Sequence, residues 1–229
     1  WRAVFLAIPL ILVMAMGQMM VIICRHVDIS IGSILAFSAI VIGLLFIQFP
    51  GLSLWLSLLI TAFVGLVMGL INGFIVTRFN VHSIIVTLGT LSLYRGLVFI
   101  VSGGRQIDRN DIPEHVVSFS QTSFLFSIPA ILIFSALIVI ITHLVMRHSV
   151  LGREIYATGS NPVAAHLKGI NVTKVTLFCF GVCGMLAGVA GLFYASRFGY
   201  VNPGVTGVGI EFIVIAGFII GGTSITGGS

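Results

Sequence analysis

The stretch Trp55–Thr77 reads WLSLLITAFVGLVMGLINGFIVT and contains no Asp, Glu, Lys or Arg. A helix needs about 20 mainly apolar residues to cross the ~30 Å hydrocarbon core of a bilayer, because each residue rises ~1.5 Å. The stretch therefore predicts a membrane-spanning helix. Gly65, Gly69 and Gly73 recur at every fourth position, a spacing that lets two helices approach closely in lipid. We expect tight helix packing there, with a hinge or sliding surface as the alternative.

The composition of the whole chain points the same way. The 229 residues are 58% hydrophobic and 7% charged, and the mean hydropathy is +1.21. An ordinary soluble domain carries about 25% charged residues, so this chain has too few to cover a water-facing surface. These values exclude a soluble enzyme, a nucleic-acid binder and a disordered chain. The net charge of +5 comes from scattered basic residues, as expected of cytoplasmic loops in a membrane protein.

Six further segments are apolar, so the sequence predicts an all-α polytopic membrane protein with about seven hydrophobic segments. The last segment is short and suits a half-helix or a re-entrant piece. We expect a single transmembrane domain over residues 1–229, truncated at both ends, because the chain starts at Trp1 and stops after a glycine turn. The seven segments are Val4–Cys24, Ile31–Ile47, Trp55–Thr77, Ile84–Val101, Phe124–Met146, Val175–Ala195 and Val208–Ile220.

The connection 147–174 is the longest basic connection in the chain. It contains four Lys and Arg residues against Glu154 alone. Basic loops stay in the cytoplasm, so this connection is predicted to be cytoplasmic. Alternation of the spans then puts Gly103–Ser123 and Ser196–Gly207 outside and returns Gly221–Ser229 to the inside.

A short helix is predicted within this connection. Asn161 can cap it, Pro162 suits its first position, and Gly169 can end it after Val163–Lys168. So short a helix is unstable alone, and a partner protein that docks on it is the natural explanation. A helix lying on the membrane surface is the alternative, although its apolar face is weak.

Charged residues inside apolar segments are costly and need a reason. Arg95 and Glu211 both lie towards the outer half of their segments, and we expect them to neutralise each other across helices. The alternative is that Arg95 reaches outward to the headgroups while Glu211 sits among them. Asp28 precedes a helix start, where a carboxylate accepts free backbone N–H groups; the functional alternative is a broken helix beside a transport path.

The sequence gives little indication of catalysis or of cofactor or metal binding. The histidines are isolated, no Cys/His spacing suits a metal, and no phosphate-binding loop of the Walker type appears. We therefore expect no catalytic residues, no cofactor and no metal in this chain. Polar side chains within the apolar segments are candidates to line a transport path, and helix-to-helix hydrogen bonds are the alternative role. These residues are Asn72, Thr87, Thr90 and Ser92.

Four motifs run in order along the chain and resemble one known family. His26–Ser33 is similar to the pattern G-I-D-L-S-V-G-S, and Thr87–Thr90 with Tyr94–Gly96 is similar to TLGT followed by RG. The loop after Gly152 resembles GR..YA.G.N..AA followed by GI, and Thr206–Glu211 with Gly221–Ser224 resembles GxGxE followed by GGTS. Together they resemble the permease subunits of bacterial ABC sugar importers of the ribose, rhamnose and autoinducer-2 type. Arg25 and His26 depart from the usual glycines.

The resemblance implies a fragment of a permease of roughly ten spans in the bacterial inner membrane. Two permease subunits, identical or homologous, would sit on two cytoplasmic ATPases that bind ATP and Mg, and a periplasmic binding protein would deliver the sugar. Transport would proceed by alternating access. The loop 147–174 would be the coupling loop, and its contact residues would be Gly159, Asn161, Pro162, Ala164, Ala165 and Gly169.

An ion-coupled secondary transporter is the alternative function. Such a transporter needs carboxylates within its spans, and Glu211 is the one acidic residue deep in any predicted segment. An intramembrane enzyme needs paired catalytic groups, which the sequence does not offer.

Overall fold

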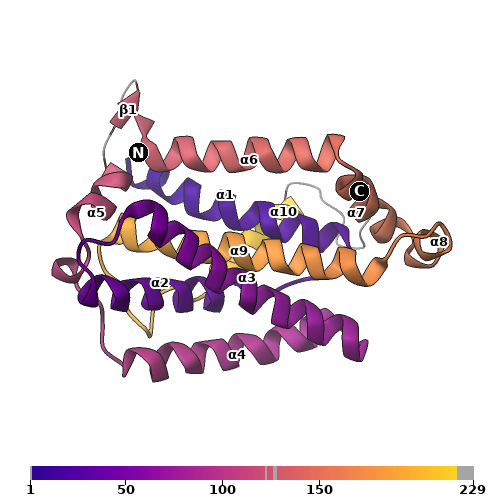
Figure 1. Cartoon of the computed structure of the whole chain (residues 1–229), viewed down its shortest axis with the longest axis horizontal. Helices are drawn as coiled ribbons and strands as arrows, with labels where there is room; N and C mark the ends of the chain where they lie inside the picture. The colour runs from indigo at the N-terminus through magenta and orange to yellow at the C-terminus, as the bar shows by residue number, and fades with distance from the viewer. Residues whose placement is uncertain (1, 122, 126–127, 221–229) are drawn as a thin grey trace.

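The structure is a computed structural model that describes residues 2–121, 123–125 and 128–220. These residues form a bundle of helices along one long axis, with one small antiparallel hairpin at an end (Figure 1). The helices are α1 (Arg2–Ile23), α2 (Ile31–Gln48), α3 (Leu54–Phe79), α4 (Ser83–Ser102), the 3₁₀ turn η1 (Arg109–Asp111), α5 (Glu114–Gln121), α6 (Ala130–His148), α7 (Val150–Ser160), α8 (Pro162–Leu167), α9 (Val172–Phe198) and α10 (Ile210–Ile220); the strands are β1 (Ser123–Leu125) and β2 (Ile128–Pro129).

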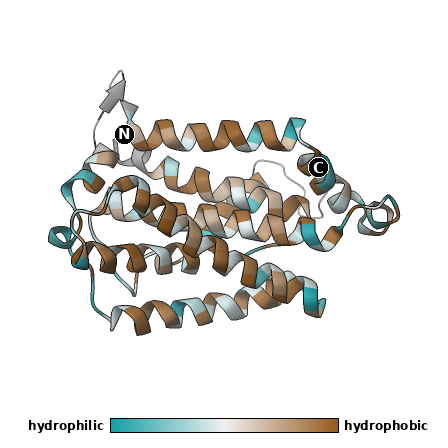
Figure 2. Ribbon diagram, in the orientation of Figure 1, coloured by the Kyte–Doolittle hydropathy of each residue, from teal (hydrophilic) through white to brown (hydrophobic). Residues whose placement is uncertain are grey.

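Each of the seven predicted apolar segments contains a helix, which confirms the all-α polytopic membrane fold. Among the described residues, α2, α3, α4, α6 and α9 are long and apolar enough to cross a bilayer, and α1 holds a shorter apolar stretch. Hydrophobic residues line the helices along their length, and hydrophilic residues gather towards the two ends of the bundle (Figure 2). The chain is therefore a multi-pass membrane protein.

Two helices begin later than predicted. The segment predicted from Phe124 becomes helical only at Ala130, because Pro129 disfavours the helical conformation in the residue before it and the preceding chain forms the hairpin. The last segment begins at Ile210 instead of Val208, after Gly207 and Gly209, which both have positive φ. Its 11 described residues run to Ile220, and the chain after Ile220 lies outside the described residues, so the half-helix stays a prediction.

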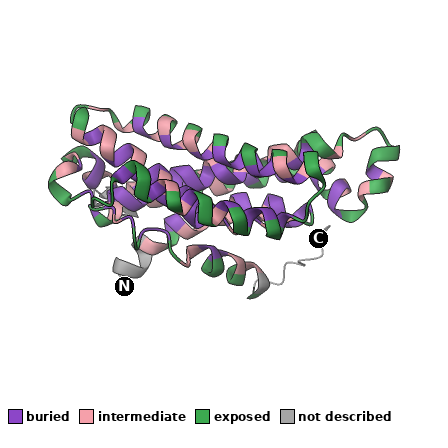
Figure 3. Ribbon diagram, turned by 90° about the horizontal axis from the view of Figure 1, so that it is seen from below, coloured by how far each residue is buried: buried purple, intermediate pink, exposed green. Residues whose placement is uncertain are grey.

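Helix α9 is the centre of the bundle, and it packs against α1, α2 and α3 (Figures 1 and 3). Helix α9 carries its own ridge of small residues, Gly181, Gly184, Gly188 and Gly191, of which Gly184 and Gly188 lie against the Gly65–Gly73 ridge on α3. A Cβ on Gly184 would lie 2.7 Å from the Cα of Gly69, and still closer to the carbonyl oxygen of Gly65. The two backbones thus touch, which confirms the tight-packing interpretation of both ridges.

The two ends of the bundle differ in charge. Helices α7 and α8 lie at one end, and α5 with the hairpin lies at the other (Figure 1). Most basic residues gather at the α7–α8 end, where Glu154 is the one acid on α7 and α8. At the opposite end, Arg105 and Arg109 form ion pairs with Asp111 and Glu114. The basic residues of the first end are Arg25, Arg78, Arg147, Arg153, Lys168 and Lys174.

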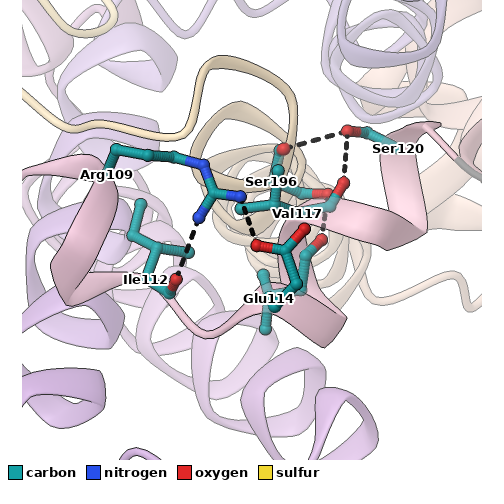
Figure 4. Close-up of polar contacts among 7 residues, drawn as sticks. Arg109, Ile112, Glu114, Val117, Ser120 and Ser196 are labelled. Atoms are coloured by element: carbon teal, nitrogen blue, oxygen red, sulfur yellow. Dashed lines mark hydrogen bonds and ion pairs between the residues drawn. The ribbon is translucent and has the colours of Figure 1, made fainter.

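The stretch between α4 and α6, predicted only as an outer loop, is a folded cap. Ile107 pairs with Val201 in a short β-bridge. The hydroxyl of Ser120 donates to the carbonyl of Ser196 at 2.9 Å, which ties α5 to α9 (Figure 4). Arg109 adds a contact to Glu114 and one to the carbonyl of Ile112. Apolar cap residues are fully buried against α2 and α9, so the cap closes this end of the bundle.

Replacing Gly184 with Ala tests the contact between α3 and α9. The new methyl group has no room, so we expect the free energy of unfolding to fall by about 1–3 kcal/mol, measured by thermal unfolding of the full-length protein in detergent. Gly89→Ala is the matched control, because Gly89 is also helical but has no neighbouring atom within 4 Å. An unchanged midpoint for Gly184→Ala would show that the two backbones do not touch.

Candidate functional site

The turn between α1 and α2 begins with a left-handed residue. Arg25 has φ of 66°. The N–H of His26 donates to the carbonyl of Val21 at 3.0 Å, and that of Arg25 donates to Ile22 at 2.9 Å, which together form a Schellman cap at the end of α1. This is the position where the resembling family has glycine. The guanidinium of Arg25 donates to the carbonyl of Ser160, the last residue of α7, at 2.6 Å.

His26 turns inward at this cap. Its ring lies 5.8 Å from that of Phe180 on α9. Burial, and to a smaller extent the neighbouring His82, together lower the pKa of His26 to about 4. His26 is therefore neutral at physiological pH and packs as an aromatic ring, which suits a turn pressed against a membrane helix.

Asp28 is fully buried at the centre of a polar cluster. Its carboxylate accepts hydrogen bonds from the N–H of Ser30 at 2.8 Å and from the hydroxyl of Ser30 at 2.7 Å. The amide of Asn72 on α3 donates to the carboxylate at 3.3 Å and to the Ser30 hydroxyl at 2.8 Å. Tyr94 on α4 donates to the Asn72 oxygen at 3.1 Å. We call Asp28, Ser30, Asn72 and Tyr94 the Asp28 cluster; it joins the α1–α2 turn to two helices.

Asp28 lies beside the start of α2, but its carboxyl does not accept an N–H group of the helix itself. Ser30 is the residue that precedes the first helical residue of α2, and Asp28 accepts the Ser30 N–H one step before it. Burial raises the pKa of the Asp28 carboxyl, and the hydrogen bonds from Ser30 and Asn72 act in the opposite direction. Asp28 has no ion pair among the described residues, so Ser30 and Asn72 supply the hydrogen bonds that its buried carboxyl oxygens need.

Two of the residues predicted for a transport path are buried and hydrogen-bonded within the protein. Asn72 and Thr87 are both fully buried. Asn72 belongs to the Asp28 cluster, and the Thr87 hydroxyl donates to the carbonyl of Val27 at 3.3 Å and to that of Ser83 at 2.9 Å. Thr90 is 7% exposed, whereas Ser92 is exposed on the outer face of α4. Of the four, Ser92 alone is open to a passing molecule.

The chain after α9 turns back into the bundle. It leaves the cap at Val201, and by Thr206 it has reached Arg95 on α4, whose guanidinium donates to the Thr206 carbonyl at 2.6 Å. The next residue, Gly207, lies directly against Gly32 in the first turn of α2. This descent ends where α10 begins, and α10 packs on α1 and α2 with Phe212 and Ile213 exposed on its other side.

Glu211 lies at the start of α10, with its carboxylate against Gly32. It is 6% exposed, and its Oε2 atom has no hydrogen-bond partner among the described residues. The predicted pair with Arg95 is not formed directly: no Arg95–Glu211 contact lies within 4 Å in the described part of the chain. The reason is that Arg95 is held by the Thr206 carbonyl. The two charges still lie near each other, and one carboxylate oxygen stays free.

The predicted short helix of the basic connection is present as α8. The side chain of Asn161 accepts hydrogen bonds from the N–H groups of Val163 and Ala164, both at 3.1 Å. Pro162 is the first helical residue, and Gly169, at φ of 84°, follows its end. These features confirm the predicted cap and stop.

Sequence analysis missed two features of this region. Helix α7 precedes α8, and its Gly159 is buried. On α8 itself, Ala165 is 3% exposed, whereas Val163 and Leu167 are 70% and 81% exposed. The apolar surface that α8 offers is therefore formed by Val163 and Leu167. The i, i+4 spacing of two apolar residues was the available signal.

The sulfur atoms near the α1–α2 turn make packing contacts. The Sγ atoms of Cys24 and Cys179 lie 3.5 Å apart, and that of Cys183 lies 3.5 Å from the side-chain oxygen of Gln18. In the part of the chain that the structure describes, no three His, Cys, Asp or Glu side chains gather as metal ligands.

Comparisons with known proteins agree on one family. The family model described as branched-chain amino acid transport system, permease component, matches residues 2–228. The chain is 36% identical over 226 residues to the autoinducer 2 import system permease protein LsrC of Yersinia enterocolitica, covering 99% of this chain and 61% of that protein. It is 34% identical to the proteins of the same name from Yersinia pseudotuberculosis serotype O:1b and Yersinia pestis strain Pestoides F, covering 63% of each. The chain thus spans less than two thirds of these relatives. No solved structure matches it.

Replacing Asp28 tests the polar cluster. Asp28→Ala leaves three buried donors without an acceptor, so we expect the free energy of unfolding to fall by about 3 kcal/mol or more. Asp28→Asn keeps one acceptor and should cost less. Ser38→Ala is the control, because Ser38 is a fully buried hydroxyl of α2 with no hydrogen-bond partner in the described part of the chain. Thermal unfolding of the full-length variants measures all three, and equal midpoints for Asp28→Ala and Ser38→Ala would contradict the role of the cluster.

Proposed function

Because the chain belongs to the family of branched-chain amino acid transport system permease components, we propose that it is the transmembrane subunit of an ATP-driven importer. Its cargo is a small sugar or sugar-like molecule, which it moves from the periplasm to the cytoplasm by alternating access. The relatives named for autoinducer 2 import make that compound the first substrate to assay. The family is one of transport permeases, not of enzymes, and ATP and Mg bind to a partner subunit.

One observation carries the coupling role. Helix α8 is capped by Asn161, ended at Gly169, and presents Val163 and Leu167 almost fully to solvent. We call these two side chains, Val163 and Leu167, the α8 knob. Apolar side chains exposed in this way are typical of a docking contact with a partner protein. The partner here is a cytoplasmic ATPase. Residues 1–229 then act as one permease domain, in which 147–174 is the coupling loop.

A chain of contacts leads from α8 into the bundle. Asn161 caps α8 and follows Ser160 directly, and the Ser160 carbonyl accepts the hydrogen bond from Arg25. Arg25 belongs to the turn that also holds Asp28. A movement of α8 driven by the ATPase would therefore reach α2, α3 and α4 through this turn and the Asp28 cluster. Alternating access requires such a link, because each state must make different contacts at the coupling helix.

The charge distribution supports the orientation. The basic α7–α8 end is cytoplasmic in the inner membrane by the positive-inside tendency, and the folded cap with its paired charges faces the periplasm. A periplasmic binding protein docks on that cap. A second permease subunit, identical or homologous, packs on part of the exposed apolar surface of α3 and α4, where Phe63 and Ile100 are 64% and 75% exposed.

The substrate path passes the start of α10. The free Oε2 atom of Glu211 is an acceptor that a sugar hydroxyl can use, and Arg95 lies close enough to interact with its charge. Buried polar groups at the start of a broken helix are typical of transport sites. Ser92 lies one turn from Arg95 and adds a hydroxyl on the exposed face of α4. Thr90 lies on the same helix. Asn72 and Thr87 hold the α1–α2 turn against α3 and α4 through their hydrogen bonds.

Uptake into vesicles separates the importer from the ion-coupled alternative. Vesicles that contain the full-length permease, its ATPase and the binding protein should accumulate autoinducer 2 or a related sugar only when ATP is supplied. An ionophore that collapses ion gradients should leave this uptake unchanged, and a non-hydrolysable ATP analogue should abolish it. Uptake that needs the ion gradient and ignores ATP would assign the chain to the secondary transporters.

Replacement of the α8 knob tests the docking contact. In the double variant Val163→Ser, Leu167→Ser we expect ATPase association and ATP-driven uptake to fall about tenfold or more, because buried apolar anchors dominate such interfaces. Val150→Ser is the matched control, since Val150 is 60% exposed on α7 but lies off the knob. Full association of the double variant, with its thermal midpoint unchanged, would remove α8 from the mechanism.

A further inference from the structure

A basic cavity lies at the junction of α6 and α7, away from both the Asp28 cluster and α8. Its volume is about 530 Å³, and its lining contains two guanidinium groups, an imidazole and a phenol but no carboxylate. Each of these groups can donate hydrogen bonds to an anion. The lining residues are His143, Met146, Arg147, Arg153 and Tyr156.

The two arginines have no counter-charge of their own. Neither Arg147 nor Arg153 forms an ion pair within 4 Å in the described ranges, where both ion pairs lie at the opposite end of the bundle. Arg153 makes only a long contact of 3.5 Å with the carbonyl of His148. Two positive charges at one cavity repel each other, so an anion bound between them would relieve that repulsion. Arginine is also the side chain best suited to phosphate.

An apolar strip on α6 leads to this cavity. The helix lies at one edge of the bundle (Figure 1), its ribbon is mostly hydrophobic (Figure 2), and several large hydrophobic residues of it are exposed. They recur every three or four residues up to the turn that carries His143 and Arg147. The strip consists of Ile133, Leu137, Ile140, Ile141 and Leu144, which are 42% to 55% exposed.

We propose that this cavity binds the phosphate of an anionic phospholipid, whose acyl chains lie along the strip of α6. The chemistry is that of a phosphate ester, and the strip favours a lipid over a free anion as its source. A cavity at the end of a spanning helix lies at headgroup depth, where basic pockets bind acidic lipids. Tyrosines such as Tyr156 are enriched at this depth.

The lipid would hold α7 as well as α6, because Arg147 comes from α6 and Arg153 from α7. Helix α7 runs directly into Asn161 and α8. Lipid binding would thus support the coupling loop; that consequence rests on the proposed function, whereas the binding itself does not.

Native mass spectrometry of the delipidated full-length protein tests the site. With added phosphatidylglycerol we expect bound lipid on the parent, and binding about tenfold weaker in Arg147→Gln, Arg153→Gln. The matched control is Arg78→Gln, Lys174→Gln, which removes two exposed basic residues from the same end of the bundle. It should bind as the parent does. Arg147→Lys, Arg153→Lys keeps both charges and should retain most of the binding.

Three results would overturn the proposal. Phosphatidylcholine could bind as well as phosphatidylglycerol, or the double glutamine variant could bind as the parent does. Inorganic phosphate at millimolar concentration could displace the lipid completely, which would make the ligand a free anion. Thermal midpoints recorded without lipid show whether each variant is folded, so that lost binding is separated from lost structure. Failure here leaves the ATP-dependence of uptake unaffected.

Discussion

Backbone contact along α9 is the constraint on which the structure depends. Lipid tails are as apolar as the helices, so association in a bilayer relies on close van der Waals packing. A Cβ on Gly17 of α1 would lie 2.7 Å from the Cα of Cys183, and one on Gly191 would lie 2.6 Å from the carbonyl oxygen of Leu35 on α2. With the Gly65–Gly184 contact to α3, three helices touch α9 at glycine. These glycine contacts fix how closely α1, α2 and α3 pack around α9.

Polar groups far apart in the chain come together in two different ways. In the Asp28 cluster, the N–H and hydroxyl groups of Ser30 and the amide of Asn72 all donate hydrogen bonds to the carboxylate. A buried network of this kind is rigid. At Glu211 one carboxylate oxygen has no partner within residues 2–121, 123–125 and 128–220, although an unpaired buried acceptor is costly. The first arrangement suits a joint that transmits movement between helices. The Glu211 arrangement suits a site at which the free carboxylate oxygen accepts a hydrogen bond from a hydroxyl of a bound molecule.

Features that depend on residues close together in the chain were predicted from the sequence. Apolar runs predicted the long helices, and Asn161, Pro162 and Gly169 predicted the bounds of α8, because capping depends on neighbours in the chain. Helix α7 was missed because its sequence is polar and contains two glycines, which lower helix propensity; Gly152 is needed there, since a Cβ would overlap the carbonyl of Met146. The partners of Asp28 and Arg95 were also missed. They depend on which faces α3, α4 and the chain after α9 present, and no local pattern encodes that choice. The motif residues Gly221–Ser224 and the predicted inside segment Gly221–Ser229 lie outside the described residues.

Arg25 shows how the turn and the coupling loop depend on each other. A non-glycine residue in the left-handed region costs roughly 1–2 kcal/mol, and glycine, usual in the resembling family, avoids that cost. The arginine gains a hydrogen bond to Ser160, one of the last carbonyls of α7. Those carbonyls lack helical partners and carry the negative end of the helix dipole, so a guanidinium is well placed there. Glycine would relax the turn but release α7. The strained residue is therefore the one that keeps the α1–α2 turn attached to the helix leading into α8.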